Sequence, residues 1–138
     1  MTFRQELELI RTRHHGVLRP QNVVDFARNR RTALHSKFCW DNTEAGKKYR
    51  LWQARQLISI TITVETPDVP SHRVYVSMRR DRQLPDGGYR STVEVLSEDE
   101  SRRQLLNEAM AEFQSMKRRY GHLKELVEIF AAIDRLQR

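Results

Sequence analysis

The 138-residue chain lacks the cysteine pairs that form disulfides and the long apolar segments that hold a protein in a membrane. It contains one cysteine, Cys39, which excludes an internal disulfide and favours a reducing compartment. No apolar run approaches the roughly 20 residues of a transmembrane helix. The first ten residues, MTFRQELELI, mix acidic and basic side chains with apolar ones, unlike a secretory signal peptide. These absences predict a cytoplasmic protein without a membrane partner.

Signatures of catalysis are also missing from the sequence. The Gly87-Gly88 pair lacks the Lys and Ser/Thr that follow the glycines of a phosphate-binding P-loop. Asp41 and Glu44 have the spacing of a helix cap, and Asp81 lies among arginines, where ion pairing is its ordinary role. We therefore expect no enzymatic activity, no cofactor and no small-molecule substrate.

Four side chains of the zinc-ligand type occur in the first forty residues: His14, His15, His35 and Cys39. His35 and Cys39 are four positions apart and would share one face of a helix. Zinc modules usually carry paired cysteines or two histidines at a fixed spacing, and this chain has a single cysteine. We interpret Cys39, which lies between two aromatic residues, as a small buried hydrophobic side chain, and expect no metal.

What the sequence has is positive charge, and this charge is segregated. The chain holds 25 Lys/Arg and 18 Asp/Glu, a net formal charge of +7. Residues 1–56 hold 12 basic and 5 acidic residues, whereas 57–96 hold 5 of each and 97–138 hold 8 of each. A positive field concentrated on one segment attracts polyanions, of which nucleic acid is the commonest inside a cell.

Helical periodicity predicts three helices in this basic part. The first covers residues 2–13, and the second opens at Pro20 and covers about 21–30. A turn with a short helical piece follows at 32–39, and the third helix begins near Asn42. Helices of this size are typical of a helix-turn-helix or one of its relatives.

The third predicted helix is the main candidate for contact with duplex DNA. Ala45, Tyr49 and Trp52 are expected to face inward, which would leave a cationic outer face for the major groove or the phosphates. A merely solvated helix face is the alternative, and the segregation of charge favours binding. The predicted nucleic-acid-binding residues are Arg28, Arg30, Arg31, Lys37, Lys47, Lys48, Arg50, Arg55, Arg79, Arg80 and Arg82, with Lys47, Lys48, Arg50 and Arg55 facing the groove.

The period of the apolar residues changes after residue 57. Apolar residues alternate with Ser and Thr from Ile58 to Val64, and alternation returns later, which predicts an antiparallel hairpin of strands 58–65 and 73–79. The arginines at the end of the second strand are compatible with a wing beside the helices, although no spacing requires a winged-helix arrangement.

The last third of the chain has the pattern of helix. Cap signals at Ser91 and Ser97 predict a short helix and then a long one. Gly121 behind a basic turn is a stop signal, but a heptad repeat passes through it in phase, which favours one continuous helix over a helical hairpin. The predicted oligomerisation residues on this repeat are Leu106, Ala109, Phe113, Met116, Tyr120, Leu123, Val127 and Phe130.

These patterns predict an α+β fold with a helical N-terminal head, an antiparallel β-hairpin and a long C-terminal amphipathic helix, or a helical hairpin in its place. The predicted division is a basic module at 1–96 and a C-terminal segment at 97–138. A continuous helix of about 38 residues would be about 57 Å long, longer than a compact domain of this size, which favours a homo-oligomer.

Several short motifs resemble a group of known sequences. They are Leu18-Arg19-Pro20, Val23-Val24, Ala27, Leu34-His35, Phe38, Trp40-Asp41, Tyr49-Arg50, Gln53-Ala54-Arg55, Leu57-Ile58, Gly87-Gly88-Tyr89-Arg90 and Val95-Leu96. In these motifs the chain resembles small uncharacterised proteins of bacterial prophages and tailed phages, a group with no assigned activity. The resemblance implies a mobile-element context, where small basic proteins often regulate transcription or assist recombination or packaging.

The leading hypothesis is a non-enzymatic, oligomeric DNA-binding protein in the cytoplasm of a bacterial host. A protein-interaction adaptor is the alternative, in which the C-terminal helix docks on another protein. A component of virion assembly or packaging is a third interpretation.

Overall fold

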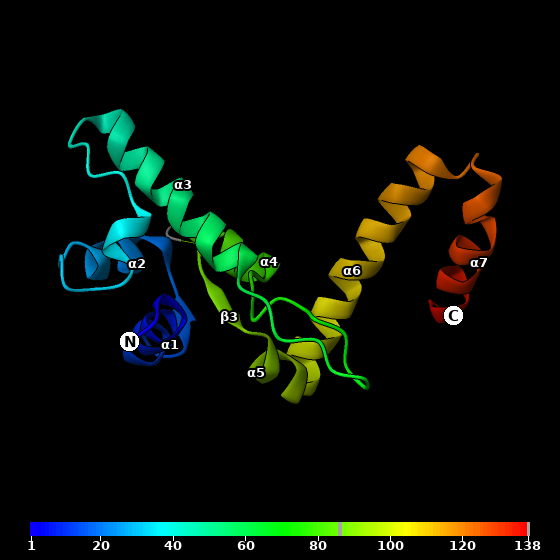
Figure 1. The fold of residues 1–138 in the computed structure, drawn as a ribbon. Coiled ribbons are helices and arrows are strands. Elements are labelled where there is room, and N and C mark those ends of the chain that lie inside the picture. The colour runs from blue at the N-terminus through cyan, green and yellow to red at the C-terminus, as the bar shows by residue number, and fades with distance from the viewer. Residues whose placement is uncertain (86, 138) are drawn as a thin grey trace. The chain divides into compact units, whose positions relative to one another are not determined.

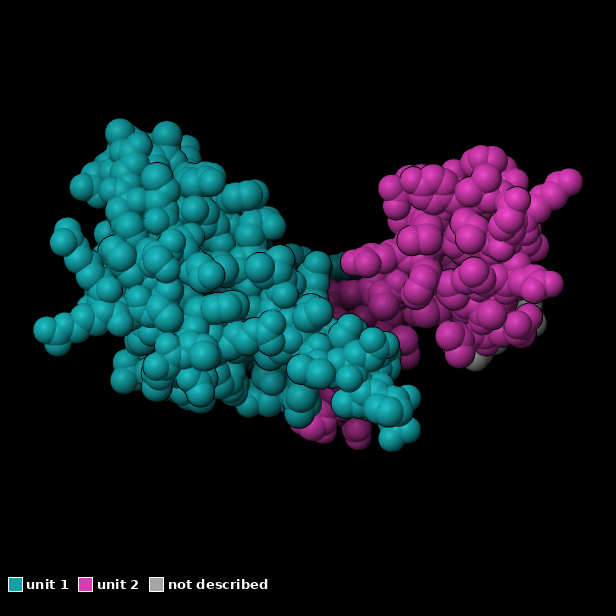
Figure 2. All heavy atoms as spheres, viewed as in Figure 1, with its two compact units in different colours: residues 1–94 teal, residues 95–138 magenta. Residues whose placement is uncertain are grey.

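The computed structural model describes residues 1–85 and 87–137. The chain divides into two compact units, Met1–Glu94 and Val95–Arg138, which Figure 2 shows in separate colours. Helices predominate, and a small three-stranded antiparallel sheet accompanies them in the first unit. The predicted α+β class is therefore confirmed.

Three helices build the first unit: α1 spans Phe3–Arg13, α2 spans Pro20–Ala27 and α3 spans Glu44–Ile60. α1 lies where the sequence predicts it, and α2 begins as predicted but ends at Ala27, before the predicted end near residue 30. A short 3-10 turn, η1, covers His35–Lys37 in the segment between α2 and α3, also as predicted.

The starts of α1 and α3 are fixed by side-chain caps. The Thr2 hydroxyl and the Gln5 side chain form a reciprocal capping box at α1. At α3 the Thr43 hydroxyl accepts a hydrogen bond from the Gly46 N–H, so Thr43 is the N-cap rather than Asp41. The Asp41 carboxylate instead accepts from the Thr43 N–H and shapes the turn before the helix.

The sheet has the strand order β1-β3-β2, with both pairs antiparallel. β1 is Val17–Leu18, β2 is Tyr75–Val76 and β3 is Tyr89–Ser91. A one-turn helix, α4 (Arg79–Arg82), lies in the connection between β2 and β3. Along the chain the order is therefore α1, β1, α2, α3, β2, α4, β3 (Figure 1).

The predicted strand at 58–65 is wrong over its first half. α3 continues to Ile60, and Ile58 is fully buried on the same helix face as Ala54, four residues earlier. The two predicted strands do meet at an isolated antiparallel bridge between Ile62 and Arg73. β2 then pairs with β3, so the main ladder joins segments other than the predicted ones.

One hydrophobic core holds the first unit together. It lies among the three helices and reaches the sheet through Leu18 and Tyr75. Burial of these side chains is the main force that keeps α3 in place. The buried members are Leu7, Ile10, Leu18, Val23, Val24, Ala27, Leu34, Phe38, Ala54, Ile58 and Tyr75.

The second unit is a helical hairpin. α5 (Thr92–Ser97) leads into α6 (Asp99–Tyr120), and α7 (Val127–Leu136) returns along it after a short 3-10 turn (Figure 1). The favoured continuous helix is therefore wrong, and the hairpin alternative is confirmed. The hairpin buries Met110, Phe130 and Ile133 between its arms.

The turn after α6 depends on Gly121. Its N–H donates to the Lys117 carbonyl at 2.7 Å, and a Cβ at this position would lie 2.6 Å from the same oxygen. Across the hairpin, the Lys117 ammonium pairs with Asp134 at 2.6 Å. The stop signal at Gly121 therefore decides the structure, and the heptad phase on its two sides belongs to two separate helices.

Candidate nucleic-acid interface

The exposed face of α3 differs from the predicted one. Tyr49 and Trp52 are 48% and 51% exposed, whereas Arg50 is 1% exposed. The prediction that the aromatic residues face inward is wrong, and so is the placement of Arg50 in the groove-facing set. The helix buries Gly46, Arg50, Ala54 and Ile58, which recur every fourth residue.

Arg50 is a structural residue that attaches the preceding loop to α3. Its Nη1 donates to the carbonyl oxygens of Cys39, at 3.2 Å, and Asp41, at 2.5 Å. Its Cζ lies 5.2 Å from the centroid of the Trp40 ring. Two carbonyls and an aromatic face compensate the loss of water around the cation, although its Nε has no hydrogen-bond partner.

Gly46 allows the loop to approach this closely. A Cβ at residue 46 would lie 2.3 Å from the Asp41 carbonyl oxygen, well inside any real contact. Gly46 and Arg50 are one helical turn apart and meet the same carbonyl group. A glycine in the first turn of a cationic helix could have signalled this close approach from the sequence.

The solvent face of α3 combines cations with an aromatic pair. The rings of Tyr49 and Trp52 stack with their centroids 5.6 Å apart and their planes 17° apart. Lys48 and Arg55 are exposed and lie on the same side of the helix as Trp52, because they are separated from it by three or four residues. Lys47 belongs to the flank, where it pairs with Glu44. A cationic face with exposed rings suits both phosphates and stacked bases.

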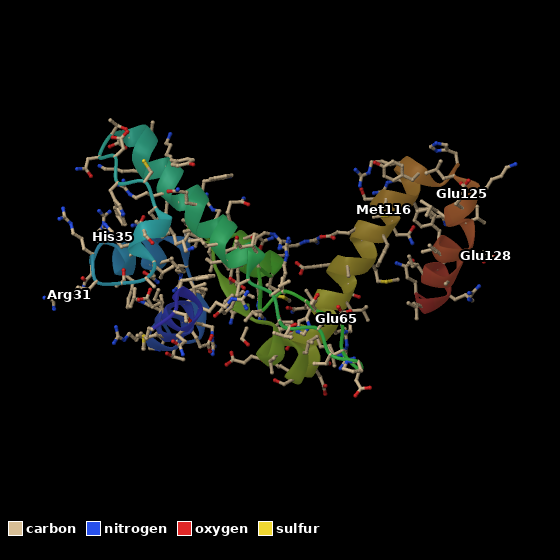
Figure 3. The ribbon with its side chains drawn as sticks, viewed as in Figure 1. Arg31, His35, Glu65, Met116, Glu125 and Glu128 are labelled. Atoms are coloured by element: carbon tan, nitrogen blue, oxygen red, sulfur yellow. The ribbon has the colours of Figure 1, made fainter. Side chains whose placement is uncertain are left out.

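The arginine loop after α2 is held by a buried carboxylate. Glu6 of α1 is 4% exposed, and its oxygens accept the backbone N–H groups of Ala33 and Leu34 at 3.0 and 2.8 Å. This anchor fixes the exit of the loop that carries Arg30 and Arg31, both exposed. Figure 3 labels Arg31 on this loop.

Two other predicted residues near this loop have local roles. Arg28 pairs with Asp25 at 3.6 Å and lies over the Trp40 ring at 5.8 Å. Lys37 lies beside α1, with its Nζ 5.3 Å from the Phe3 centroid. The structure therefore does not gather all the predicted cations on one face.

The connection between β2 and β3 does bring arginines toward α3. Arg55 of α3 and Arg82 of α4 line one open hollow of about 310 Å³. Asp81, the acidic residue of α4, is buried and receives two hydrogen bonds from Arg90, at 2.8 and 2.9 Å. The other residues that line the hollow are Pro20, Ser77, Leu84, Pro85, Gly87, Gly88 and Tyr89.

The two units divide the charge of the protein unequally. Residues 1–94 hold 17 Lys/Arg and 10 Asp/Glu, an excess of 7, whereas residues 95–138 hold 8 of each. Several acids of the first unit already bind cations or backbone N–H groups inside it, among them Glu6, Glu8 and Asp81. The net positive charge of the protein therefore lies entirely in the first unit.

A charged network joins α1 to Tyr75 of β2 and Glu94 of α5. Arg11, 8% exposed, binds both Glu8 and Glu94, and the Tyr75 hydroxyl donates to Glu8 at 2.9 Å. The Arg11 hydrogen bond holds the pKa of the Glu8 carboxyl below its usual value, with help from Tyr75. Burial raises the pKa of the Tyr75 hydroxyl, and its hydrogen bond to Glu8 raises it further.

Of the side chains considered as metal ligands, His35 makes other contacts and Cys39 is exposed to solvent. The His35 ring stacks on Trp40 with centroids 4.8 Å apart, and its Nδ1 lies 2.8 Å from the Ala27 carbonyl oxygen. Cys39 is exposed, so its interpretation as a buried hydrophobic side chain is wrong. Within residues 1–85 and 87–137, no three His, Cys, Asp or Glu side chains form a group that could hold a metal ion.

The predicted oligomerisation residues divide into two sets. Phe130 is buried between the arms of the hairpin, and Ala109 is partly buried. The others remain exposed on the second unit. They are Leu106, Phe113, Met116, Tyr120, Leu123 and Val127.

Comparison with known proteins identifies no relative: no family model, curated protein or solved structure matches the chain. Among the described residues, none of the helices combines the length and the apolar content that crossing a membrane requires.

Proposed function

We propose that the protein binds nucleic acid, with duplex DNA as its partner, through the solvent face of α3, and that it does so without catalysis. The observation that carries the proposal is the arrangement on α3. Exposed Lys48 and Arg55 flank the stacked, exposed pair of Tyr49 and Trp52, in the unit that holds the whole excess of positive charge.

The order of the elements supports the same function. Apart from the one-turn helix α4, the first unit has the order helix, strand, helix, helix, strand, strand, with the sheet order β1-β3-β2. This is also the order of a winged-helix module. In that arrangement the third helix lies in the major groove and the connection between the last two strands flanks it. The equivalent connection contains α4, and Arg82 from it shares a hollow with Arg55 of α3. The segment 28–43 between α2 and α3 is longer than the usual helix-turn-helix turn.

A salt titration with matched variants tests the proposal. The Lys48→Ala/Arg55→Ala variant is compared with Lys124→Ala/Arg135→Ala, which removes the same charge from exposed positions of the neutral unit. Anisotropy of a labelled random duplex is measured from about 50 to 300 mM salt. We expect the slope of log K against log salt to fall by about 2 for the α3 variant and to stay unchanged for the control. Equal slopes for the two variants would refute the α3 site.

The tryptophans provide an independent readout. Trp52 is exposed on α3, whereas Trp40 is held between His35 and the arginines Arg28 and Arg50. Quenching of emission upon DNA addition is expected in the wild type and absent in Trp52→Phe. A single strand of the same length is titrated in parallel, and tighter binding to it than to the duplex would contradict the duplex assignment.

A further inference from the structure

Trp52 lies at the centre of the solvent face of α3. It is two positions away from each of two buried residues, Arg50 and Ala54. Because successive residues of a helix turn by about 100°, Trp52 points about 200° away from both, directly opposite the buried face. Ala45, which is exposed, and Ser59, which is half-buried, lie seven residues to either side and point nearly the same way. The central line of the face, residues 45, 52 and 59, therefore carries no charge.

The cations of this face lie on one flank of the central line. Lys48 and Arg55 are turned from the line by about 40–60° to one side. Tyr49 and Gln56 are turned by the same angles to the other side. The flank of Arg55 is the one beside α4, because Arg55 lines the same hollow as a residue of α4. Cations at the edge of a groove-bound helix suit the phosphates, whereas the central line faces the base edges on the floor of the groove.

The indole of Trp52 has a restricted orientation and an available hydrogen-bond donor. Its ring stacks on that of Tyr49, yet about half of the residue remains exposed. Stacking limits the rotation of the ring before binding, which reduces the entropy that a contact would cost. The Trp40 N–H donates to the His35 carbonyl, whereas in the part of the chain that the structure describes the Trp52 N–H donates to no protein group.

Thymine is the base that matches an apolar ring with one available donor. In the major groove it presents its C5-methyl group together with the O4 acceptor. The methyl group can pack on the indole, and O4 can accept from the indole N–H. Guanine is read by Arg or Lys and cytosine by Glu or Asp, and the central line contains none of these. Gln56, on the flank, has the amide group that recognises adenine, the partner of thymine.

We propose that Trp52 contacts the C5-methyl group of thymine in the major groove, so that the protein prefers duplexes with A·T pairs beneath α3. Lys48 and Arg55 supply affinity without regard to sequence, and Trp52 supplies the preference. This preference rests on the proposed binding of duplex DNA by α3, and it adds the base that the surface reads.

Removing or adding one methyl group on a base tests the proposal. Deoxyuridine in place of thymidine removes the methyl group and keeps the pairing. In the reverse experiment, 5-methylcytosine in place of cytosine adds a methyl group at the same position of the groove. Anisotropy of labelled duplexes of alternating A·T or alternating G·C pairs gives each dissociation constant at one salt concentration. For the wild type we expect uracil to raise the dissociation constant about threefold to tenfold, and 5-methylcytosine to lower it by a similar factor.

Two variants of α3 distinguish the reading of the base from the attraction of charge. Trp52→Ala should bind the thymine and uracil duplexes with affinities that agree within about twofold, because the methyl group then has no ring to contact. Lys48→Ala should bind every duplex more weakly and keep the wild-type ratio between thymine and uracil, because a phosphate contact does not depend on the base. If Trp52→Ala keeps the full wild-type ratio, the proposal is wrong.

The wild-type titrations separate the reading of thymine from the binding of DNA. Salt-dependent binding with equal affinity for the thymine and uracil duplexes would overturn the reading of thymine and leave the α3 interface in place. The absence of binding to every duplex would overturn both. These comparisons need no variant, so they decide the outcome whatever Trp52→Ala does to the stability of the protein.

Discussion

The guanidinium of Arg50 lies over the indole of Trp40, with its Cζ 5.2 Å from the ring centroid, inside the loop that α3 supports. Trp40 also donates its indole N–H to the His35 carbonyl and stacks on the His35 ring. One buried cation therefore connects the loop 35–41 to the helix that carries the proposed binding face. The role of Arg50 is to position this face.

Replacing Arg50 should reduce stability rather than DNA contact alone. Arg50→Lys retains the charge but loses the planar guanidinium that lies over the Trp40 ring and places Nη1 within reach of both carbonyls. We expect a loss of about 1–3 kcal/mol in the free energy of unfolding. Arg50→Ala also leaves a cavity, and should cost about 3–5 kcal/mol. Urea denaturation measures both. If Arg50→Ala leaves the unfolding midpoint unchanged but weakens DNA binding, the structural role is wrong.

The substitution Gly46→Ala raises the helix propensity of α3 but introduces a steric clash. In an exposed helix position the change would stabilise by about 1 kcal/mol. At residue 46 the new methyl would meet the Asp41 carbonyl at 2.3 Å, and that oxygen also accepts from Arg50. We expect the clash to dominate and thermal unfolding to show a net destabilisation of about 1–3 kcal/mol. Gln56→Ala, at an exposed position of α3, is the control and should change stability little. A stabilised Gly46→Ala protein would contradict the close approach.

Glu8 should make the first unit sensitive to acid. Its pKa in the folded protein lies below the ordinary value near 4.5, so the folded state releases this proton more readily than the unfolded chain does. The resulting stabilisation is present above the ordinary pKa and is lost as the pH falls through the lowered one. Urea denaturation between pH 3 and 7 should show a smaller loss for Glu8→Gln than for the wild type. Glu44→Gln, at an exposed carboxylate, should behave like the wild type. Parallel curves for all three proteins would rule out this role.

Tyr75 should have the opposite effect at alkaline pH. Its pKa in the folded protein is raised above the ordinary value near 10, because burial disfavours the phenolate. The folded state therefore retains this proton longer than the unfolded chain, and stability falls as the pH rises above 10. Over pH 9 to 12, Tyr75→Phe should lose less stability than the wild type. Tyr49→Phe, at the exposed ring, serves as the comparison, and a response equal to that of Tyr75→Phe would contradict the prediction.

The parts of the fold that local signals determine could be predicted from the sequence. α1 follows from its spacing of Phe3, Leu7 and Ile10, and α2 follows from Pro20 at its first position. The short helix α5 also lies at the predicted place. In these cases caps and period agree, and tertiary contacts add nothing that changes the assignment.

The predictions were wrong where tertiary contacts determine the structure and local patterns do not. Ile58 and Ile60 alternate like strand residues, but Ile58 packs in the core with Ala54 as part of helix α3. Hydrophobicity does not reveal the buried face of α3, because one of its buried residues is Arg50. The guanidinium of Arg50 donates to the carbonyls of Cys39 and Asp41 in the preceding loop, and the sequence does not show these contacts. At Gly121 a local stop signal overrides a longer-range repeat.

The candidate interface could also be predicted only in part from the sequence. Lys48 and Arg55 lie in the open as the charge pattern predicts, because isolated cations on a helix favour water. The exposed stack of Tyr49 and Trp52 was not predictable, since large aromatic residues at helical spacing are usually part of a core.

The exposed thiol of Cys39 gives the protein a natural reporter position. It is the single cysteine of the sequence, and it lies in the loop that Arg50 attaches to α3. A maleimide dye or spin label would therefore attach once per chain, in the first unit, without any engineered mutation. The electron resonance line shape or the emission of such a label would report on the loop that Arg50 attaches to α3, in the wild type and in variants of Arg50.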